Sequence, residues 1–177
     1  MTTYRRLFIP GGTYFFTVAL ADRSSSLLTE RIDDLRAAYR YAHDRHPFET
    51  VAMVVLPEHI HCIWTLPEDD ADYPTRWRLL KTAFSRRIPA LEPRSNSRQA
   101  KHERGIWQRR YWEHAVRDEE DLLRHVDYIH FNPVKHGYVG RVGDWPYSTF
   151  PRFVARGWFP EDWGGDAPNG AGEEFGE

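Results

Sequence analysis

An apolar stretch that leads into two alternating histidines constrains this chain more than any other part of its sequence. Residues 51–56 read VAMVVL, a short Pro57-Glu58 link follows, and the chain continues as His59-Ile60-His61. Side chains alternate between the two faces of a β-strand, so His59 and His61 point the same way, about 6.5–7 Å apart along the strand. The pattern predicts a β-hairpin in a sheet that carries two imidazoles on one face.

The length and the cysteine content limit the class of protein. A chain of 177 residues fits one domain at 1–160 followed by a tail at 161–177. Cys62, the single cysteine, excludes an internal disulfide framework and fits a reducing compartment. No apolar run reaches the length of a signal peptide or a membrane span, so we expect a cytoplasmic protein without membrane contact.

The charge is distributed unevenly along the chain. The tail at 161–177 holds six acidic residues and no Lys or Arg, which predicts a disordered acidic segment. Residues 1–160 therefore carry 24 basic against 20 acidic side chains, a net charge of +4. Within them, residues 76–110 hold eleven Lys or Arg and two acids. A stretch this basic, interleaved with aromatic side chains, favours a nucleic-acid partner over a merely solvated surface.

The order of the expected elements identifies the fold class. Runs of β-branched and aromatic residues predict strands at 13–20, 48–56, 59–66 and about 111–116. Apolar spacings of three and four predict helices at about 27–46, 75–88 and 119–132, the last ended by Pro133, with a loop at 89–105 and an irregular aromatic wrap at 134–160. The order β-α-β-β-α-β plus a C-terminal helix predicts a ferredoxin-like α+β fold, an antiparallel sheet with two helices on one face.

The third predicted helix carries a second group of polar residues. Tyr128 and Asn132 are four residues apart, so they are neighbours on one helix face, roughly 5–6 Å apart at Cβ and away from the apolar stripe. Asn132 directly precedes Pro133, so we expect it in a frayed last turn, where its amide could instead cap the backbone. A phenol and an amide oxygen on one face could both reach a phosphate held by a metal ion.

Two imidazoles that face one space suit a divalent cation, but the motif is short. Taken alone, His59 and His61 could be sheet-surface histidines, and Tyr128 could be an aromatic residue at the edge of the core. Cys62 points to the opposite face of the strand and is excluded from the site. A tyrosine nucleophile acting on a metal-bound phosphodiester is the interpretation that uses both groups of residues.

Three segments together resemble a known family. The sequences PEHIHCIW at 57–64, WQRRYWEHAVRDEEDL at 107–122 and DYIHFNPVKHGYV at 127–139 are similar to the REP-associated tyrosine transposases, a branch of the single-tyrosine HUH endonucleases related to insertion-sequence transposases. The resemblance covers most of residues 1–155. It implies that His59 and His61 are metal ligands, that Tyr128 is the nucleophile, and that Asn132 is a third, polar ligand at a position where related transposases often have Gln.

The resemblance also implies a reaction and a substrate. Attack by Tyr128 on a phosphodiester would give a 5′-phosphotyrosine link and a free 3′-hydroxyl, which a later strand transfer can reverse. The substrate would be single-stranded DNA beside a hairpin formed by a palindromic repeat. A site of two imidazoles, one amide oxygen and substrate oxygens suits Mg²⁺ or Mn²⁺.

Further residues are candidates for contact with DNA or for a role beside Tyr128. His125, one helical turn before Tyr128, is a candidate proton acceptor, and His114 is a candidate accessory residue. The candidates for contact with phosphates or bases are Arg5, Arg6, Arg86, Arg87, Trp107, Gln108, Arg109, Arg110 and Tyr111.

Two other classes of protein share these features. A catalytically silent DNA-binding module would keep the basic surface and the fold but form no covalent adduct through Tyr128. An RNA-binding protein can have the same β-α-β-β-α-β order, but its usual basic-glycine-aromatic run is missing from the strand that carries His59 and His61. The sequence leaves open whether the chain acts as a monomer or a homodimer.

Overall fold

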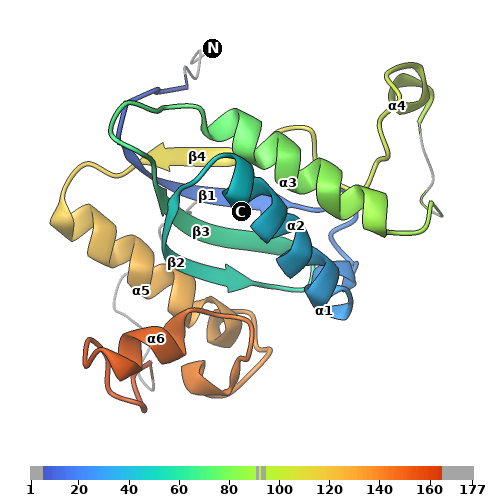
Figure 1. Ribbon diagram of the computed structural model, residues 1–177. Helices are drawn as coiled ribbons and strands as arrows, with labels where there is room; N and C mark the ends of the chain where they lie inside the picture. The colour runs from blue at the N-terminus through green and yellow to red at the C-terminus, as the bar shows by residue number, and fades with distance from the viewer. Residues whose placement is uncertain (1–5, 91, 93–94, 165–177) are drawn as a thin grey trace, which may run out of the picture.

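The computed structural model describes residues 6–90, 92 and 95–164, and its centre is a four-stranded antiparallel sheet (Figure 1). The strands are β1 (Thr13–Ala19), β2 (Glu49–Val55), β3 (His59–Thr65) and β4 (Trp112–Ala115). They lie in the order β2-β3-β1-β4, so β1 pairs with β3 on one side and with β4 on the other. The predicted ferredoxin-like α+β fold is confirmed.

The helices cover both faces of this sheet. They are α1 (Leu27–Glu30), α2 (Ile32–Arg45), α3 (Tyr73–Arg87), α4 (Asn96–Ala100), α5 (Glu119–Lys135) and α6 (Phe150–Ala155), with a short 3-10 turn, η1, at Val142–Asp144. The pair α2 and α3 packs over one face, and α5 packs on the opposite face against β2 and β3 (Figure 1). Among the described residues, no helix is both long enough and apolar enough to cross a membrane.

Alternation along the strands decides which side chains meet which helix. Phe16 of β1 packs with α2 and α3, whereas its neighbour Phe15 packs with α5. On β3, Cys62 belongs to the α2 and α3 side. Because side chains alternate along the strand, His59 and His61 point to the face opposite Cys62 and therefore face α5. The predicted common orientation of the two histidines follows directly from this pairing.

Two expected elements differ in extent from the sequence-based prediction. The first helix is interrupted at Arg31, whose backbone is not helical, so α1 and α2 replace one continuous helix at 27–46. The short helix α1 is held in place by the link between β2 and β3, because the Leu28 N–H donates to the carbonyl of Pro57. The expected loop at 89–105 contains α4, which Ser95 caps by accepting from the Arg98 N–H.

Pro133 does not end the last long helix, which was a wrong prediction. α5 continues to Lys135 with Pro133 inside it. The missing N–H of Pro133 removes one helical bond, but the next turn is closed by bonds from the His136 N–H to the Asn132 carbonyl and from the Tyr138 N–H to the Pro133 carbonyl. Asn132 consequently lies in a buried part of the helix and not in a frayed end.

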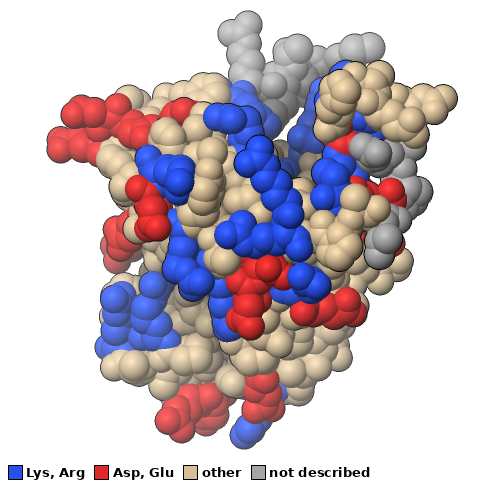
Figure 2. Space-filling model, turned by 45° about the vertical axis from the view of Figure 1, so that its right-hand side comes forward, with Lys and Arg blue, Asp and Glu red and all other residues tan. Residues whose placement is uncertain are grey.

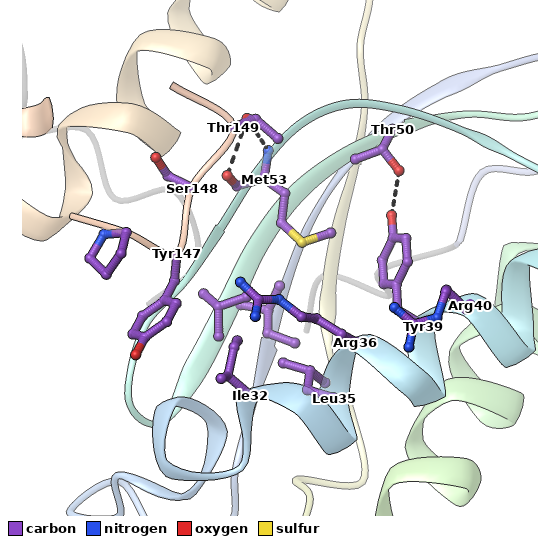
Figure 3. Close-up of a pocket in the computed structure, with 13 residues that line it drawn as sticks. Ile32, Leu35, Arg36, Tyr39, Arg40, Thr50, Met53, Tyr147, Ser148 and Thr149 are labelled. Carbon is purple, nitrogen blue, oxygen red and sulfur yellow. Dashed lines mark hydrogen bonds between the residues drawn. The ribbon is translucent and has the colours of Figure 1, made fainter. Parts of the chain in front are cut away.

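The chain after α5 closes the open edge of the sheet. The Val55 N–H donates to the Tyr147 carbonyl, and the Thr149 N–H donates to the Met53 carbonyl, so this segment runs along β2 like a short additional strand. A groove of about 490 Å³ lies between it and α2, with apolar walls and Arg36 at its rim (Figure 3). None of the predicted site residues lines this groove. Most of the predicted acidic tail, residues 165–177, is outside the described residues.

One basic residue of the 76–110 stretch is structural. The Arg76 side chain is 1% exposed and donates to the carbonyls of His46, Asp72 and Pro47 and to the carboxylate of Asp70. These bonds tie α3 to the end of α2 and to the loop before α3. Arg76 therefore does not contribute to a surface that binds polyanions.

We expect Arg76→Met to lower the free energy of unfolding by about 3 kcal/mol, because it leaves buried carbonyl groups without a donor. The matched control is Arg36→Met, since among the described residues Arg36 bonds only to exposed Asp33, and its loss should change stability by less than about 0.5 kcal/mol. Urea denaturation followed by circular dichroism measures both. Equal stability of the two variants would contradict this assignment.

Candidate active site

The centre of the site is the approach of two imidazoles on β3. The Nε2 atoms of His59 and His61 lie 2.9 Å apart, and both side chains are fully buried. The two rings meet edge to face with their centroids 4.6 Å apart. Both ring nitrogens thus converge on one point between the sheet and α5.

The outer nitrogens of the two rings are held by hydrogen bonds. The Nδ1 atom of His59 lies 2.8 Å from a carboxylate oxygen of Glu58, and that of His61 lies 2.9 Å from the Thr17 hydroxyl on β1. A ring whose Nδ1–H donates outward presents a lone pair at Nε2, which is the arrangement typical of metal-ligating histidines. The Thr17 bond follows from strand pairing, because Thr17 and His61 are direct partners.

Burial keeps these histidines neutral, as metal ligands must be. It lowers the pKa of His61 well below its ordinary value. Burial also lowers the pKa of His59, although the neighbouring Glu58 acts in the opposite direction. Burial alone would raise the pKa of Glu58, but its hydrogen bond and charge interaction with His59 outweigh that effect and lower it. Glu58 is therefore an ionised acceptor behind His59.

α5 brings Tyr128 against His61 and His136 against His59, and Asn132 lies midway between Tyr128 and His136 along the chain. The Tyr128 ring is 7% exposed and meets the His61 ring edge to face, with centroids 5.2 Å apart. Asn132, one turn later, is fully buried, and within the described part of the chain neither its amide oxygen nor its nitrogen has a hydrogen-bond partner. A buried amide without a partner is costly, so a ligand at this position is physically reasonable. The donor set of two imidazoles and one amide oxygen fits a divalent cation.

Three cationic or polar groups around the site were missed by the sequence analysis. The Lys135 ammonium lies 5.0 Å from the centre of the Tyr128 ring, and the Arg23 guanidinium lies 3.6 Å from the Glu58 carboxylate. The His136 ring centroid is 5.6 Å from that of His59. Lys135 follows Tyr128 by seven residues, two helical turns, and this spacing could have identified it. Arg23 is on a loop, for which periodicity gives no signal.

A second polar cluster lies at the start of α5. His114, Asp121 and His125 bring ligand atoms within 4.8 Å of one another, a geometry that could hold a metal ion. His114 Nε2 lies 2.7 Å from an Asp121 carboxylate oxygen, and His125 Nδ1 lies 2.7 Å from the Asp121 carbonyl oxygen. Phe15 connects this cluster to the first site, because its ring packs against His125 at 4.7 Å and Tyr128 at 6.0 Å.

Arginines share the carboxylate of this second cluster. Arg117 donates to Asp121 through its backbone N–H and its Nε, and Arg124 donates to the other carboxylate oxygen. Burial alone would raise the pKa of Asp121, but the bonds from Arg117 and His114 outweigh it and hold the pKa well below its ordinary value. Two guanidinium groups beside the carboxylate repel a cation, so this cluster is a weaker metal site than the paired histidines.

Part of the basic stretch lines a hollow between α3 and the segment that precedes β4. Arg86, Arg87, Gln108, Arg109 and Arg110 are all exposed. The hollow has a volume of about 640 Å³, and Lys81, Arg86, Arg98, Arg104 and Arg109 contribute to its walls. Figure 2 brings the α4 side of the molecule forward and shows Lys and Arg side chains through the middle of this face, interrupted by a few acidic groups.

Several predicted DNA contacts have other partners. Trp107 is 7% exposed and its ring packs edge to face on Phe84, so its placement does not suit base stacking. Arg109 bonds to Glu103 and to the Ser97 hydroxyl. A separate contact joins the N-terminal segment to β4.

In that contact, Arg6 lies 4.6 Å from the centre of the Tyr111 ring and pairs with Glu113 at 3.2 Å. Tyr111 is half-buried on the α3 side of the sheet. Arg5, the other predicted N-terminal contact, lies outside the described residues.

Comparison with known proteins identifies close relatives. No protein-family model matches the chain. A REP-associated tyrosine transposase of Escherichia coli strain K12 is 51% identical over 176 residues, which cover 99% of this chain and 99% of that protein. A Haemophilus influenzae protein with the same family name is 53% identical over 167 residues, covering 94% of this chain and 95% of its own length.

A solved structure agrees with these relatives. It is described as a REP-associated tyrosine transposase bound to a REP hairpin, and it matches this fold with a TM-score of 0.84 and 50% sequence identity, covering 100% of this chain and 98% of that chain. The family resemblance in the sequence is thereby confirmed, and with it the assignment as an enzyme. The chain belongs to the REP-associated tyrosine transposases.

Proposed function

We propose that this chain is a metal-dependent endonuclease and strand transferase that cleaves single-stranded DNA next to a hairpin through a covalent link to Tyr128. The observation that supports it most directly is the 2.9 Å approach of the His59 and His61 Nε2 atoms beneath the Tyr128 ring. A hydrogen bond between the two rings would also give this distance, but it would not account for the buried Asn132 amide, which has no partner among the described residues. A cation between the two rings accounts for the geometry.

The residues that would hold the cation are His59, His61 and Asn132. Glu58 and Thr17 fix the orientation of the two rings, as partners of the outer nitrogens usually do in metal sites. We expect Mg²⁺ or Mn²⁺, because a site with few protein ligands leaves positions for phosphate oxygens. When bound, the ion would polarise the scissile phosphate and offset its charge.

Tyr128 supplies the nucleophile in this proposal. Its phenol oxygen attacks the phosphorus, an oxygen–phosphorus bond to the tyrosine forms, and the bond from phosphorus to the 3′-oxygen of the preceding nucleotide breaks. The leaving 3′-oxygen takes a proton and becomes a hydroxyl. One phosphoester replaces another, so the same 3′-hydroxyl or another can reverse the step and rejoin the strand.

His125 is the residue that we propose to accept the phenol proton. Its Nδ1 lies 2.7 Å from the Asp121 carbonyl and donates to it, which leaves Nε2 as the basic nitrogen. Burial lowers the pKa of His125, so the ring is neutral and able to accept a proton at physiological pH. His125 and Tyr128 are one turn apart and share contact with Phe15.

The substrate proposal combines the surface charge with the relative. The solved relative is described as bound to a REP hairpin, and this chain has an exposed basic face around the hollow between α3 and the segment before β4. We infer that this face holds the phosphates of a hairpin stem while a single-stranded flank reaches Tyr128. The chain could do this as a monomer or as a homodimer.

A catalytically silent hairpin-binding protein is the alternative. It accounts equally well for the basic face, and a hydrogen bond between the imidazoles accounts for their approach, but it gives no reason for the buried amide of Asn132. The two functions differ in one product, a covalent protein–DNA adduct.

We expect Tyr128→Phe to abolish the adduct, a loss of about a thousandfold or more, while hairpin affinity changes less than twofold, because only the nucleophilic oxygen is removed. Denaturing gels of 5′- and 3′-labelled hairpin oligonucleotides with Mn²⁺, Mg²⁺ or chelator measure the adduct. Tyr41→Phe, on α2, is the matched control and should react like the wild type. Binding without any adduct in the wild type, across varied flanking sequences, would favour the silent protein.

We expect Asn132→Leu to lower the affinity for Mn²⁺ at least about tenfold without lowering stability, because leucine keeps the branched skeleton and removes two buried polar atoms. Calorimetric titration with Mn²⁺ and urea denaturation measure the two effects. His59→Ala/His61→Ala should remove Mn²⁺ binding, whereas exposed His43→Ala should not. Unchanged Mn²⁺ affinity in Asn132→Leu would show that the amide is not a ligand.

We expect the double variant Arg86→Gln/Arg110→Gln to weaken hairpin binding and to reduce the slope of log affinity against log salt by about 1.8, because two phosphate contacts are lost. Fluorescence anisotropy at several salt concentrations gives the slope. Arg36→Gln/Arg45→Gln removes the same charge from α2, which does not line this hollow, and should leave the slope unchanged. Equal slopes for the two double variants would exclude the proposed face.

A further inference from the structure

A row of side chains leads across the sheet from the paired histidines to the edge strand β4. Thr17 pairs with His61 on one side and with Trp112 on the other, so the three residues lie side by side on the α5 face. With neighbouring strands about 5 Å apart, Trp112 is about 10 Å from His61. Trp112 therefore belongs to the same surface as the paired histidines.

The Trp112 ring is only partly covered. It is half-buried, and its inner edge packs against Phe15 with ring centroids 5.7 Å apart at an angle of 70°. α5 packs mainly on β2 and β3, and β4 is the edge strand on the far side of β1. The part of the sheet around Trp112 therefore stays accessible beside the helix that carries Tyr128.

A second ring extends this platform. His114 follows Trp112 on the same face of β4, and the two rings are parallel within 4°, with centroids 5.8 Å apart. Asp121 fixes His114 through its Nε2, while the His125 ring stacks on its inner side at 4.8 Å. His114 keeps 26% of its side chain exposed. His114 thus stacks with both Trp112 and His125 and holds the Trp112 ring in a fixed orientation next to the site.

Two exposed cations flank these rings. Arg117 and Arg124 keep 66% and 47% of their side chains exposed while they bond to the buried Asp121 carboxylate. Arg117 uses its side-chain Nε and Arg124 one terminal nitrogen, so each guanidinium retains further N–H donors for a ligand. Asp118 adds a second negative charge that acts on Arg117, so these four charges balance, and the cluster would hold a phosphate through individual N–H donors.

Aromatic platforms beside cations are the chemistry that binds single-stranded nucleic acid. We propose that Trp112 and His114, with Arg117 and Arg124, form a nucleotide subsite that stacks a base of the single strand next to the scissile phosphate and so sets the position of cleavage. The proposal rests on the function proposed above. A separation of about 10 Å corresponds to at most about three stacked nucleotides, so the stacked base lies very near the bond that breaks.

The test measures binding in a Tyr128→Phe background, so that it does not depend on cleavage. We expect Trp112→Ala to weaken binding of a hairpin with a single-stranded flank about tenfold and to leave binding of a blunt hairpin stem unchanged. Trp112→Phe should keep most of the affinity. The matched control is Trp158→Ala, because Trp158 is 61% exposed and packs on Phe153 of α6.

A fluorescent base analogue, 2-aminopurine, locates the stacked nucleotide. Placed in turn at each position of the flank, it should be quenched at one position by the parent protein, and Trp112→Ala should remove that quenching. With Tyr128 restored, Trp112→Ala should cut at several neighbouring phosphates instead of one. Equal affinity for the flanked hairpin, with unchanged quenching, would overturn the subsite.

A further variant keeps the proposal falsifiable if Trp112→Ala fails to fold. Arg117→Gln/Arg124→Gln retains amide donors for Asp121, and we expect it to reduce the salt slope for the flanked hairpin by about 1.4 and not to affect the blunt stem. An unchanged slope would overturn the phosphate contacts. If the wild type forms no adduct while the flank-specific losses persist, the proposed reaction fails and the subsite stands.

Discussion

Two imidazole nitrogens held 2.9 Å apart inside the protein are the constraint on which the rest of the site depends. Their approach requires that β3 keep a regular alternation through His59 and His61 and that β1 present Thr17 opposite His61. It also requires a covering element, since exposed rings would be solvated separately. α5 provides that cover and brings Tyr128 and Asn132 with it.

One face of the sheet carries most of the aromatic core, and the other carries the candidate active site. On the α2 and α3 side, aromatic residues such as Trp64 and Trp77 stack with centroids 4.2 Å apart, and Arg76 ties the helix ends together. The α5 side holds most of the buried polar groups discussed here, including His125. Burying polar groups is tolerable where they find partners, and hydrogen bonds hold Arg76 on one face and the paired histidines on the other.

The sequence predicted those parts of the site that depend on local periodicity. His59 and His61 follow from strand alternation, and Tyr128 and Asn132 follow from helical spacing. Thr17 and Trp112 could not be found in this way, because their roles come from the register between strands distant in sequence. For a similar reason, the number of basic residues in a stretch did not predict which of them are exposed.

Counting basic residues cannot tell exposed Arg86 from buried Arg76, although both lie in one stretch of the sequence. Only the tertiary fold decides which guanidinium groups meet backbone carbonyls and which meet solvent. Trp107 lies in the same stretch, but its ring is buried and packs edge to face on Phe84, which the composition of the stretch does not reveal.

The helix that carries Tyr128 continues past Pro133, where the proline predicted that it would end. Ending α5 at Asn132 would expose the amide and would leave Lys135 without a fixed position over the Tyr128 ring. Continuing through proline gives up one backbone bond, a modest loss when His136 and Tyr138 close the next turn. The extra turn instead buries Asn132 without a partner among the described residues. Of the two losses, the amide without a partner is the one that a ligand can offset, and Tyr128 and His136, four residues to either side of it, both contact the paired histidines.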